Sequence, residues 1–275
     1  MPFSESDLPE LLRRLIIAPA TSPAIAPDIS QEMLQAGGVG IQPETDASFF
    51  FDAINIAEAL EIYTAVREIG PEHSAEIGFC CAGSGLAILK GLEDQGRGTH
   101  HACDPYQSKY AKNSGLRNVQ KAGLAHRLHF QERFPEDALP ALPPLQFVFI
   151  DASHLFDTSM LDFVLADKKL EIGGVVAFHD LWMPSLQKVV RYILANRNYE
   201  IYRPSGVPEQ PSSRQTSVRS VLANGIASGL KRLPRAERFF ARELLEPWSR
   251  FGFSNLAFLR KKGADERDWR HFRPF

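Results

Sequence analysis

Cysteine is scarce in this sequence, and no cysteines have the spacing of a zinc or disulfide motif. The chain has 275 residues and only three cysteines, Cys80, Cys81 and Cys103. None of them belongs to a CxxC pair, and adjacent residues such as Cys80 and Cys81 are poor partners for an S–S bond because of the geometry that the bond requires. These features argue against a disulfide scaffold, and we expect reduced thiols in a cytoplasmic protein.

Long apolar runs and a large excess of charge of one sign are also missing. The first residues contain no basic cluster, and the apolar run at 15–18 is far shorter than a signal peptide or a membrane span requires. The formal net charge is -2, so no overall field attracts nucleic acid or an anionic membrane. We therefore expect neither a nucleic-acid partner nor a membrane partner.

Hydrophobic residues make up 44% of the chain, which is enough for one large α/β core. They recur in short runs that predict strands at 75–79, 99–103, 128–131, 147–150, 175–178, 199–202 and 255–259. Helical spacing is found between several of these runs, at 52–69, 83–92, 156–170 and 185–196. This alternation predicts an α/β fold that is Rossmann-like and doubly wound, with a mostly parallel seven-stranded sheet and helices on both faces.

Two segments lie outside that alternation. Residues 1–45 contain one helical pattern and a proline-rich stretch, which predicts an N-terminal helical arm before a domain at 46–275. Residues 205–252 begin polar and proline-rich, become basic and amphipathic, and predict a helical insert before the last strand. We expect this insert to cover the carboxyl edge of the sheet and to offer a surface for a homo-oligomer. The alternative is a solvated face without a partner.

A glycine-rich turn joins the first expected strand to the following helix. It consists of EIG at 76–78, the loop FCCA at 79–82, and GSG at 83–85. Glycines let the backbone approach a ligand, and the N-terminus of the helix adds positive potential. The loop breaks the GxGxxG spacing of dinucleotide-binding enzymes. The turn therefore indicates a different ligand, and the alternative is a tight turn that binds nothing.

Asp104 follows the second expected strand, about twenty residues beyond the glycine turn, where an acidic side chain accepts hydrogen bonds from ribose hydroxyls. Asp followed by proline is also a common start of a helix, with the aspartate as the N-cap. The sequence leaves both interpretations open, and both can hold at once.

Asp151 comes directly after the apolar strand expected at 147–150, and Asp180 comes two residues after the one expected at 175–178. Ligands of open α/β sheets bind at the carboxyl ends of the strands. Two carboxylates on neighbouring strands repel each other unless one is protonated or a cation lies between them, and Mg²⁺ prefers such oxygen pairs. The alternative is that each aspartate is only a capping or loop residue.

Two histidines lie beside these aspartates. His154 is three residues after Asp151, so one turn of chain places both side chains over the same site, where the imidazole can accept a proton from a substrate hydroxyl. His179 directly precedes Asp180, but adjacent residues of a strand face opposite ways. A packed or exposed histidine without a catalytic role is the alternative for both.

At these residues the chain resembles the class I S-adenosylmethionine-dependent methyltransferases, in particular the branch of macrolide sugar O-methyltransferases and cephalosporin-pathway methyltransferases. The resemblance covers about residues 52–202. It depends on the order of EIG with GSG, DPYQ, AGLAHRLHF, FIDASH and GGVVAFHD. Ala82 departs from it, because the family usually has glycine there.

The resemblance implies S-adenosylmethionine as the cofactor. The residues that it places around the methionine part are Glu76, Gly78, Gly83 and Ser84, with Asp104 at the ribose. It also implies Mg²⁺ or another divalent cation, and the metal ligands that we predict are Asp151, Asp180 and His179.

The expected reaction is O-methylation of a small hydroxylated acceptor such as a sugar or another natural product. A cation held by Asp151 lowers the pKa of the acceptor hydroxyl, and His154 removes the proton. Three alternatives remain: a metal-independent N- or C-methyltransferase, an NAD-linked oxidoreductase, and a binding protein without catalysis.

Overall fold

The computed structural model describes residues 54, 56–205, 225–230 and 247–275. The N-terminal arm predicted at 1–45 lies outside the described residues. Most of the insert predicted at 205–252 lies outside them too, although residues 225–230 are helical. No helix within the described part of the chain has the length and apolarity to cross a membrane.

Seven strands form one sheet in the order β3-β2-β1-β4-β5-β7-β6. Their bounds are β1 His73–Ile77, β2 Thr99–Cys103, β3 Leu128–Gln131, β4 Leu145–Ile150, β5 Leu170–Phe178, β6 Tyr199–Tyr202 and β7 Ala257–Lys261. The first five strands are parallel, and β7 runs antiparallel to both β5 and β6. This confirms the predicted Rossmann-like, mostly parallel seven-stranded sheet.

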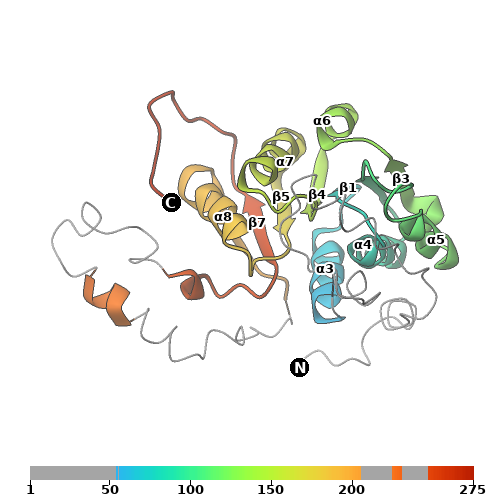
Figure 1. Cartoon of the computed structure of the whole chain (residues 1–275), viewed down its shortest axis with the longest axis horizontal. Coiled ribbons are helices and arrows are strands. Elements are labelled where there is room, and N and C mark those ends of the chain that lie inside the picture. Colours follow the sequence, from blue (N-terminus) through green and yellow to red (C-terminus); the bar gives the residue numbers. More distant parts are fainter. Residues whose placement is uncertain (1–53, 55, 206–224, 231–246) are drawn as a thin grey trace.

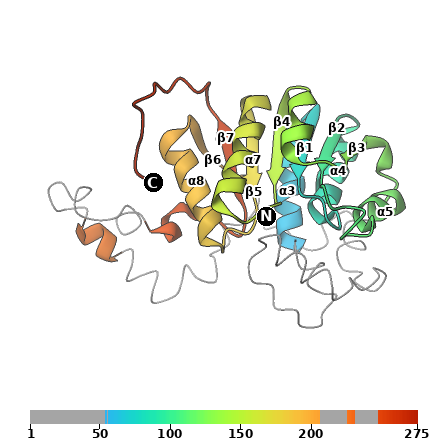
Figure 2. The ribbon, with the colours of Figure 1, turned by 45° about the horizontal axis from the view of Figure 1, so that its top comes forward.

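Helices cover both faces of the sheet (Figures 1 and 2). The α-helices are α3 Ile56–Ile69, α4 Gly83–Gln95, α5 Ser114–Lys121, α6 Pro135–Ala138, α7 Phe156–Lys169 and α8 Pro184–Asn196. Short 3-10 turns are η4 Ala125–Arg127, η5 Leu139–Ala141 and η6 Trp248–Phe251.

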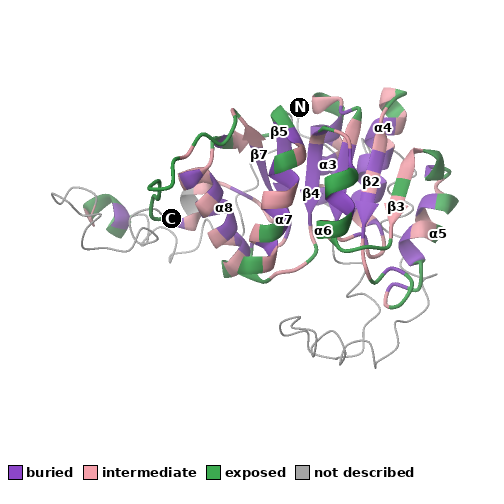
Figure 3. Ribbon diagram, turned by 90° about the horizontal axis from the view of Figure 1, so that it is seen from above, coloured by how far each residue is buried: buried purple, intermediate pink, exposed green. Residues whose placement is uncertain are grey.

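The sheet separates two hydrophobic cores. Along β4, Phe147 and Phe149 pack with α3 and α4, whereas Val148 and Ile150 pack with α7 and α8. Successive side chains of a strand point to opposite faces, so a continuous apolar run is what a strand covered on both sides requires. Figure 3 shows the central strands as buried, with exposed residues on the outer sides of α6 and α7.

The sequence-based bounds differ from the structure mainly around two glycines. We expect Gly173 and Gly174 to end a helix, but both lie inside β5. Here α7 ends at Lys169, and the register between β4 and β5 shifts between Leu145 and Phe147. β1 also lies two residues earlier than expected, so Phe79 belongs to the loop and fills the core.

Asp162 on α7 carries a buried carboxyl group, and we expect Asp162→Asn to stabilise the protein. The side chain is 1% exposed, and neither oxygen finds a hydrogen-bond partner within the described residues. Burial raises the pKa of Asp162 from 3.8 to about 7. This displacement corresponds to at most about 4 kcal/mol, because burial penalises the ionised form only in the folded state.

The sign follows from linkage: a raised acidic pKa means that folding stability falls as the pH rises from the unfolded value toward the folded one. The gain in unfolding free energy of Asp162→Asn should therefore grow between about pH 4 and about pH 7 and stay level above. Urea titrations at several pH values measure it. Asp167→Asn on the same helix is the matched control, and it should destabilise because Asp167 accepts a hydrogen bond from Tyr199. A pH-independent difference at Asp162 would contradict the prediction.

Candidate active site

Four parallel strands end side by side at one edge of the sheet. Ile77 pairs with Cys103 and with Ile150, and Ile150 pairs with Phe178. The residues directly beyond these strand ends are Gly78, Asp104, Asp151 and His179. The strand register therefore brings the residues singled out in the sequence to the edge where open α/β sheets bind ligands.

Gly78 allows the end of β1 to pack closely against the end of β4. Its φ is +89°, and a Cβ atom at this position would lie 2.2 Å from the backbone oxygen of Asp151. Only glycine fits that conformation and that close contact. The glycine turn and the Asp151 loop are consequently packed against each other, which places a ligand of the turn beside Asp151.

Glu76 lies beneath the turn rather than on its surface. The side chain is 0% exposed; Ser84 Oγ donates a hydrogen bond to Oε1, and His100 Nε2 is 3.2 Å from Oε2. Burial raises the pKa of Glu76. Both Glu76 and Ser84 thus support the turn from inside, whereas Gly78 and Gly83 are partly exposed. Direct contact of Glu76 and Ser84 with a cofactor stays a prediction.

Asp104 ties the loop after β1 to the end of β2. Its Oδ2 accepts hydrogen bonds from the backbone N–H groups of Phe79 at 3.2 Å and Cys80 at 2.9 Å, and its Oδ1 accepts one from Tyr106 at 2.9 Å. A carboxylate has about four acceptor positions, so about one remains for a ligand. The alternative of Asp104 as the N-cap of a helix is wrong, because residues 105–110 form turns and the bond from Tyr106 closes one of them. Contact of the remaining acceptor position with a ribose hydroxyl stays a prediction.

The loop that carries Cys80 and Cys81 is held at several further points. Gln107 Nε2 donates to the backbone oxygen of Cys80, and Asn118 Nδ2 to that of Cys81, both at 3.0 Å. Cys80 has a φ of +40°, and the two thiol sulfurs lie 4.0 Å apart. All three cysteines are free thiols.

We expect Cys81 to react first with an alkylating reagent. The contact with the Cys80 thiol, with a further contribution from Ser114, lowers the pKa of Cys81 to about 7, whereas burial raises that of Cys103 to about 12. Because the thiolate is the nucleophile, iodoacetamide near neutral pH should label Cys81 at least roughly tenfold faster than the other two cysteines. Peptide mapping by mass spectrometry measures the rates. Ser114→Ala should slow the labelling, and earlier labelling of Cys80 or Cys103 would contradict the prediction.

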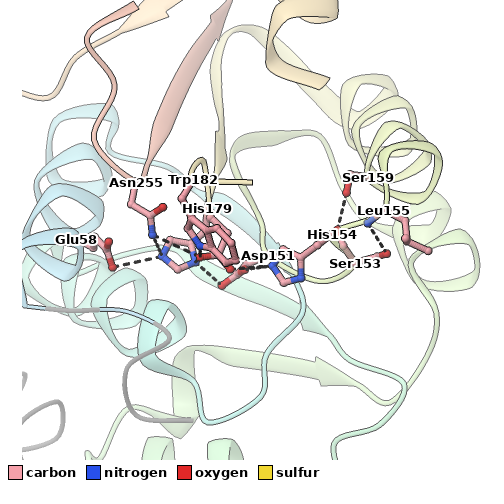
Figure 4. Close-up of polar contacts among 10 residues, drawn as sticks. Glu58, Asp151, Ser153, His154, Leu155, Ser159, His179, Trp182 and Asn255 are labelled. Atoms are coloured by element: carbon pink, nitrogen blue, oxygen red, sulfur yellow. Dashed lines mark hydrogen bonds and ion pairs between the residues drawn. The ribbon is translucent and has the colours of Figure 1, made fainter. Parts of the chain in front are cut away.

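Asp151, His154 and Asp180 form a cluster next to the glycine turn. Figure 4 shows Asp151 and His154 in this cluster. One ligand atom of each lies within 4.8 Å of the others, which is the spacing of groups that can share a metal ion. His154 Nε2 is 2.8 Å from Asp180 Oδ2 and 3.9 Å from Asp151 Oδ1. The His154 side chain is 34% exposed, so a molecule from solvent can reach it.

His179 lies on the buried side of this cluster. It is 2% exposed; its Nδ1 is 3.3 Å from Asp151 Oδ2 and 3.6 Å from Asp180 Oδ1. Its Nε2 faces away from them, toward Glu58 and Asn255 (Figure 4). His179 is not one of the three clustered residues above, and its role as a ligand stays a prediction.

Opposite charges stabilise one another in this cluster. Burial alone would raise the pKa of Asp180, but the hydrogen bond with His154 and the charge of His179 lower it to about 2. The hydrogen bond with Asp180 raises the pKa of His154. Burial alone would lower the pKa of His179, but the carboxylates of Asp151 and Glu58 outweigh it and raise the pKa to about 11. The pKa of each imidazole is thus raised, and that of Asp180 lowered, by the opposite charges around it.

Three site residues have no signal in the sequence motifs. Trp182 Nε1 donates to Asp180 Oδ1 at 2.9 Å, and Asn255 Nδ2 is 3.5 Å from the same oxygen. Glu58 reaches the site from α3. The position of Trp182 close to Asp180 could have suggested its contact, but nothing local marks Glu58 or Asn255.

Comparisons with known proteins agree with this arrangement. Residues 75–181 match a family described as "Methyltransferase domain". A caffeoyl-CoA O-methyltransferase of Mesembryanthemum crystallinum is 31% identical over 150 residues, which are 46% of this chain and 54% of the relative. Caffeoyl-CoA O-methyltransferase 2 of Petunia hybrida is 30% identical over 148 residues, 46% of this chain and 57% of the relative. The chain thus spans about half the length of the curated relatives it matches.

Among solved structures, an O-methyltransferase of Streptomyces achromogenes involved in tomaymycin synthesis is 17% identical, with a TM-score of 0.48; the match covers 63% of this chain and 87% of that one. The family match spans the glycine turn, Asp104, Asp151, His154 and Asp180. Residues 75–181 of this chain are therefore similar to a methyltransferase domain.

Proposed function

We propose that this chain is an S-adenosylmethionine-dependent O-methyltransferase that acts on a small hydroxylated acceptor with the help of a divalent cation. The observation that carries the proposal is the meeting of Asp151, His154 and Asp180 beside the glycine turn. Both curated relatives are named as O-methyltransferases, which supports O-methylation. Class I methyltransferases use S-adenosylmethionine, and Asp104 offers a ribose hydroxyl an acceptor oxygen.

The residues present fit a divalent cation. Two carboxylates and two imidazoles face one another, and Nδ1 of His179 is buried without a hydrogen bond from the described residues. Carboxylates and imidazoles are the ligands that divalent metals take from proteins. Asp151, Asp180 and His179 would hold the ion, and a cation bound there lowers the pKa of an acceptor hydroxyl.

The chain's own residues supply orientation and proton transfer. Methyl transfer from a sulfonium requires donor and acceptor in line, so the main task of the glycine turn and Asp104 is to hold the donor in place. His154 is the more exposed of the two histidines and is the one that an acceptor can touch. Nε2–H donates to Asp180 Oδ2, so the other ring nitrogen, Nδ1, would take the acceptor proton, and Asp180 would stabilise the imidazolium that results.

Transfer of a labelled methyl group tests this proposal. The chain is incubated with labelled S-adenosylmethionine and, in separate reactions, caffeoyl-CoA, simple catechols or hydroxylated sugars. Each acceptor is tested once with Mg²⁺ or Mn²⁺ and once with excess EDTA. We expect O-methylated product from at least one acceptor, and only with the cation. Equal product in EDTA would refute cation assistance, and N- or C-methylated product would refute O-methylation. A cytoplasmic location and a homo-oligomeric state remain predictions of the sequence.

A further inference from the structure

We propose that Glu58 is a positioning residue that holds His179 with Nδ1 directed at Asp151 and Asp180, so that the cation site gains a nitrogen ligand. This inference rests on the cation site proposed above. It adds to that site a residue from α3, which lies outside the matched methyltransferase domain.

The contacts form a line through the buried imidazole. Glu58 Oε2 is 3.3 Å from His179 Nε2, and on the other side of the ring Nδ1 is 3.3 Å from Asp151 Oδ2. Glu58 is 6% exposed and His179 is 2% exposed, so neither side chain can touch an acceptor. Figure 4 shows His179 between Glu58 and Asp151. The geometry therefore assigns both residues to support of the site from inside.

The charge of Glu58 determines which ring nitrogen keeps its hydrogen when a cation binds. A buried carboxylate next to a nitrogen lone pair is repulsive, so Nε2 carries hydrogen and donates it to Glu58. Carboxylates also face Nδ1, and a cation between Asp151 and Asp180 would take the place of the Nδ1 proton, so that Nδ1 would become the ligand. Histidines that bind metals commonly donate their other N–H to a carboxylate, and this partner fixes the ring and its tautomer. Asn255 Nδ2, 3.1 Å from the same Nε2, is itself a donor, so it does not compete with Glu58 for this hydrogen and donates to Asp180 Oδ1 instead.

A nitrogen ligand changes which cation the site prefers. Mg²⁺ takes oxygen ligands almost exclusively, whereas imidazole favours first-row transition metals. Asp151 and Asp180 alone would suit Mg²⁺, but together with Nδ1 they suit ions such as Co²⁺, Mn²⁺ or Zn²⁺. We therefore infer that the Glu58–His179 contact makes this site favour a transition-metal ion over Mg²⁺.

Glu58→Gln tests the inference, with Glu61→Gln as the matched control. Glu61 lies one turn further along α3, is 7% exposed, and accepts a hydrogen bond from Ser254 instead of contacting His179. Burial raises the pKa of Glu61 to about 7, so the comparison is made near pH 8, where this group is mostly ionised. Calorimetry measures Co²⁺ and Mg²⁺ affinity for the full chain, and the visible spectrum of bound Co²⁺ reports nitrogen ligation.

In Glu58→Gln we expect the Co²⁺ affinity to fall by about 10- to 100-fold, more than the Mg²⁺ affinity, with a shifted Co²⁺ spectrum. Glu61→Gln should keep the wild-type ratio of the two affinities. In a His179→Asn background, Glu58→Gln should have little further effect on Co²⁺ affinity, because Glu58 acts through the imidazole. Circular dichroism shows that each variant is folded.

An unchanged Co²⁺-to-Mg²⁺ ratio in Glu58→Gln would overturn the inference and leave the proposed cation site intact. An equal loss of Co²⁺ affinity in Glu61→Gln would mean that any negative charge on α3 has this effect. That result would also overturn the inference. If the wild-type chain bound neither cation, the cation site and the role of Glu58 would both fail.

Discussion

Asp151→Asn is expected to weaken divalent-cation binding by about a hundredfold or more and to reduce methyl transfer to a similar extent. Asp151 Oδ1 and Oδ2 face His154 and His179 respectively, so Asp151 lies at the centre of the cluster. Asparagine keeps the shape but removes the charge, and one carboxylate then remains to hold the ion. Calorimetry with Mn²⁺ and labelled methyl transfer measure the two effects.

Asp157→Asn is the control for Asp151→Asn. Asp157 is exposed on the first turn of α7, six residues further along the chain, and its Oδ1 accepts a hydrogen bond from the backbone of Thr158. This variant should keep both cation affinity and turnover. Full activity of Asp151→Asn, or of metal-free wild-type protein in excess EDTA, would refute the cation-assisted mechanism.

Asp104→Ala is expected to weaken S-adenosylmethionine binding by on the order of 3 kcal/mol or more, about a hundredfold or greater in Kd. The substitution removes an acceptor for the ribose. It also releases the backbone N–H groups of Phe79 and Cys80, which hold the loop beside the glycine turn. Both losses act on the same ligand, so the effect should exceed that of a single hydrogen bond.

Calorimetry with S-adenosylmethionine measures the affinity of Asp104→Ala, and circular dichroism shows whether the fold survives. Asp137→Ala, which removes an exposed carboxylate on α6, is the control and should bind like the wild type. An unchanged affinity in Asp104→Ala would mean that the carboxylate serves only the backbone contacts with Phe79, Cys80 and Tyr106.

The fold could be predicted because its strands and its turns each leave a local signal in the sequence. A strand covered on both faces needs an uninterrupted apolar run, as in 147–150, and glycines mark the turns between strands and helices. Where these signals conflict, the prediction fails. Gly173 and Gly174 are typical of a helix end, yet pairing with β4 extends β5 through both of them.

Half of the candidate site could be predicted for a related reason. Parallel strands end at a common edge, so Asp104, Asp151 and Asp180 could all be placed at that edge from the sequence. His179 is among the predicted metal ligands, although the alternation of side chains along a strand would by itself turn it away from Asp180. Asp180 has a φ of +55°, which ends the alternation of β5 and lets neighbouring residues 179 and 180 both face Asp151.

The remaining site contacts depend on tertiary packing that no local pattern records. Glu58 and His179 are 121 residues apart in the sequence, and Asn255 precedes the last strand. Phe79 follows β1 in what reads as an exposed glycine loop, but it is 2% exposed and packs against Phe130. Burial of Phe79 and the hydrogen bonds to Asp104 together shape this loop.

Titration of the unmodified chain with S-adenosylmethionine and, separately, with NAD by calorimetry tests the central claim most directly. The glycine turn, its FCCA loop and Asp104 predict saturable binding of about one S-adenosylmethionine per chain and no measurable binding of NAD. Binding of NAD without binding of S-adenosylmethionine, or binding of neither, would contradict the assignment of this chain as a methyltransferase.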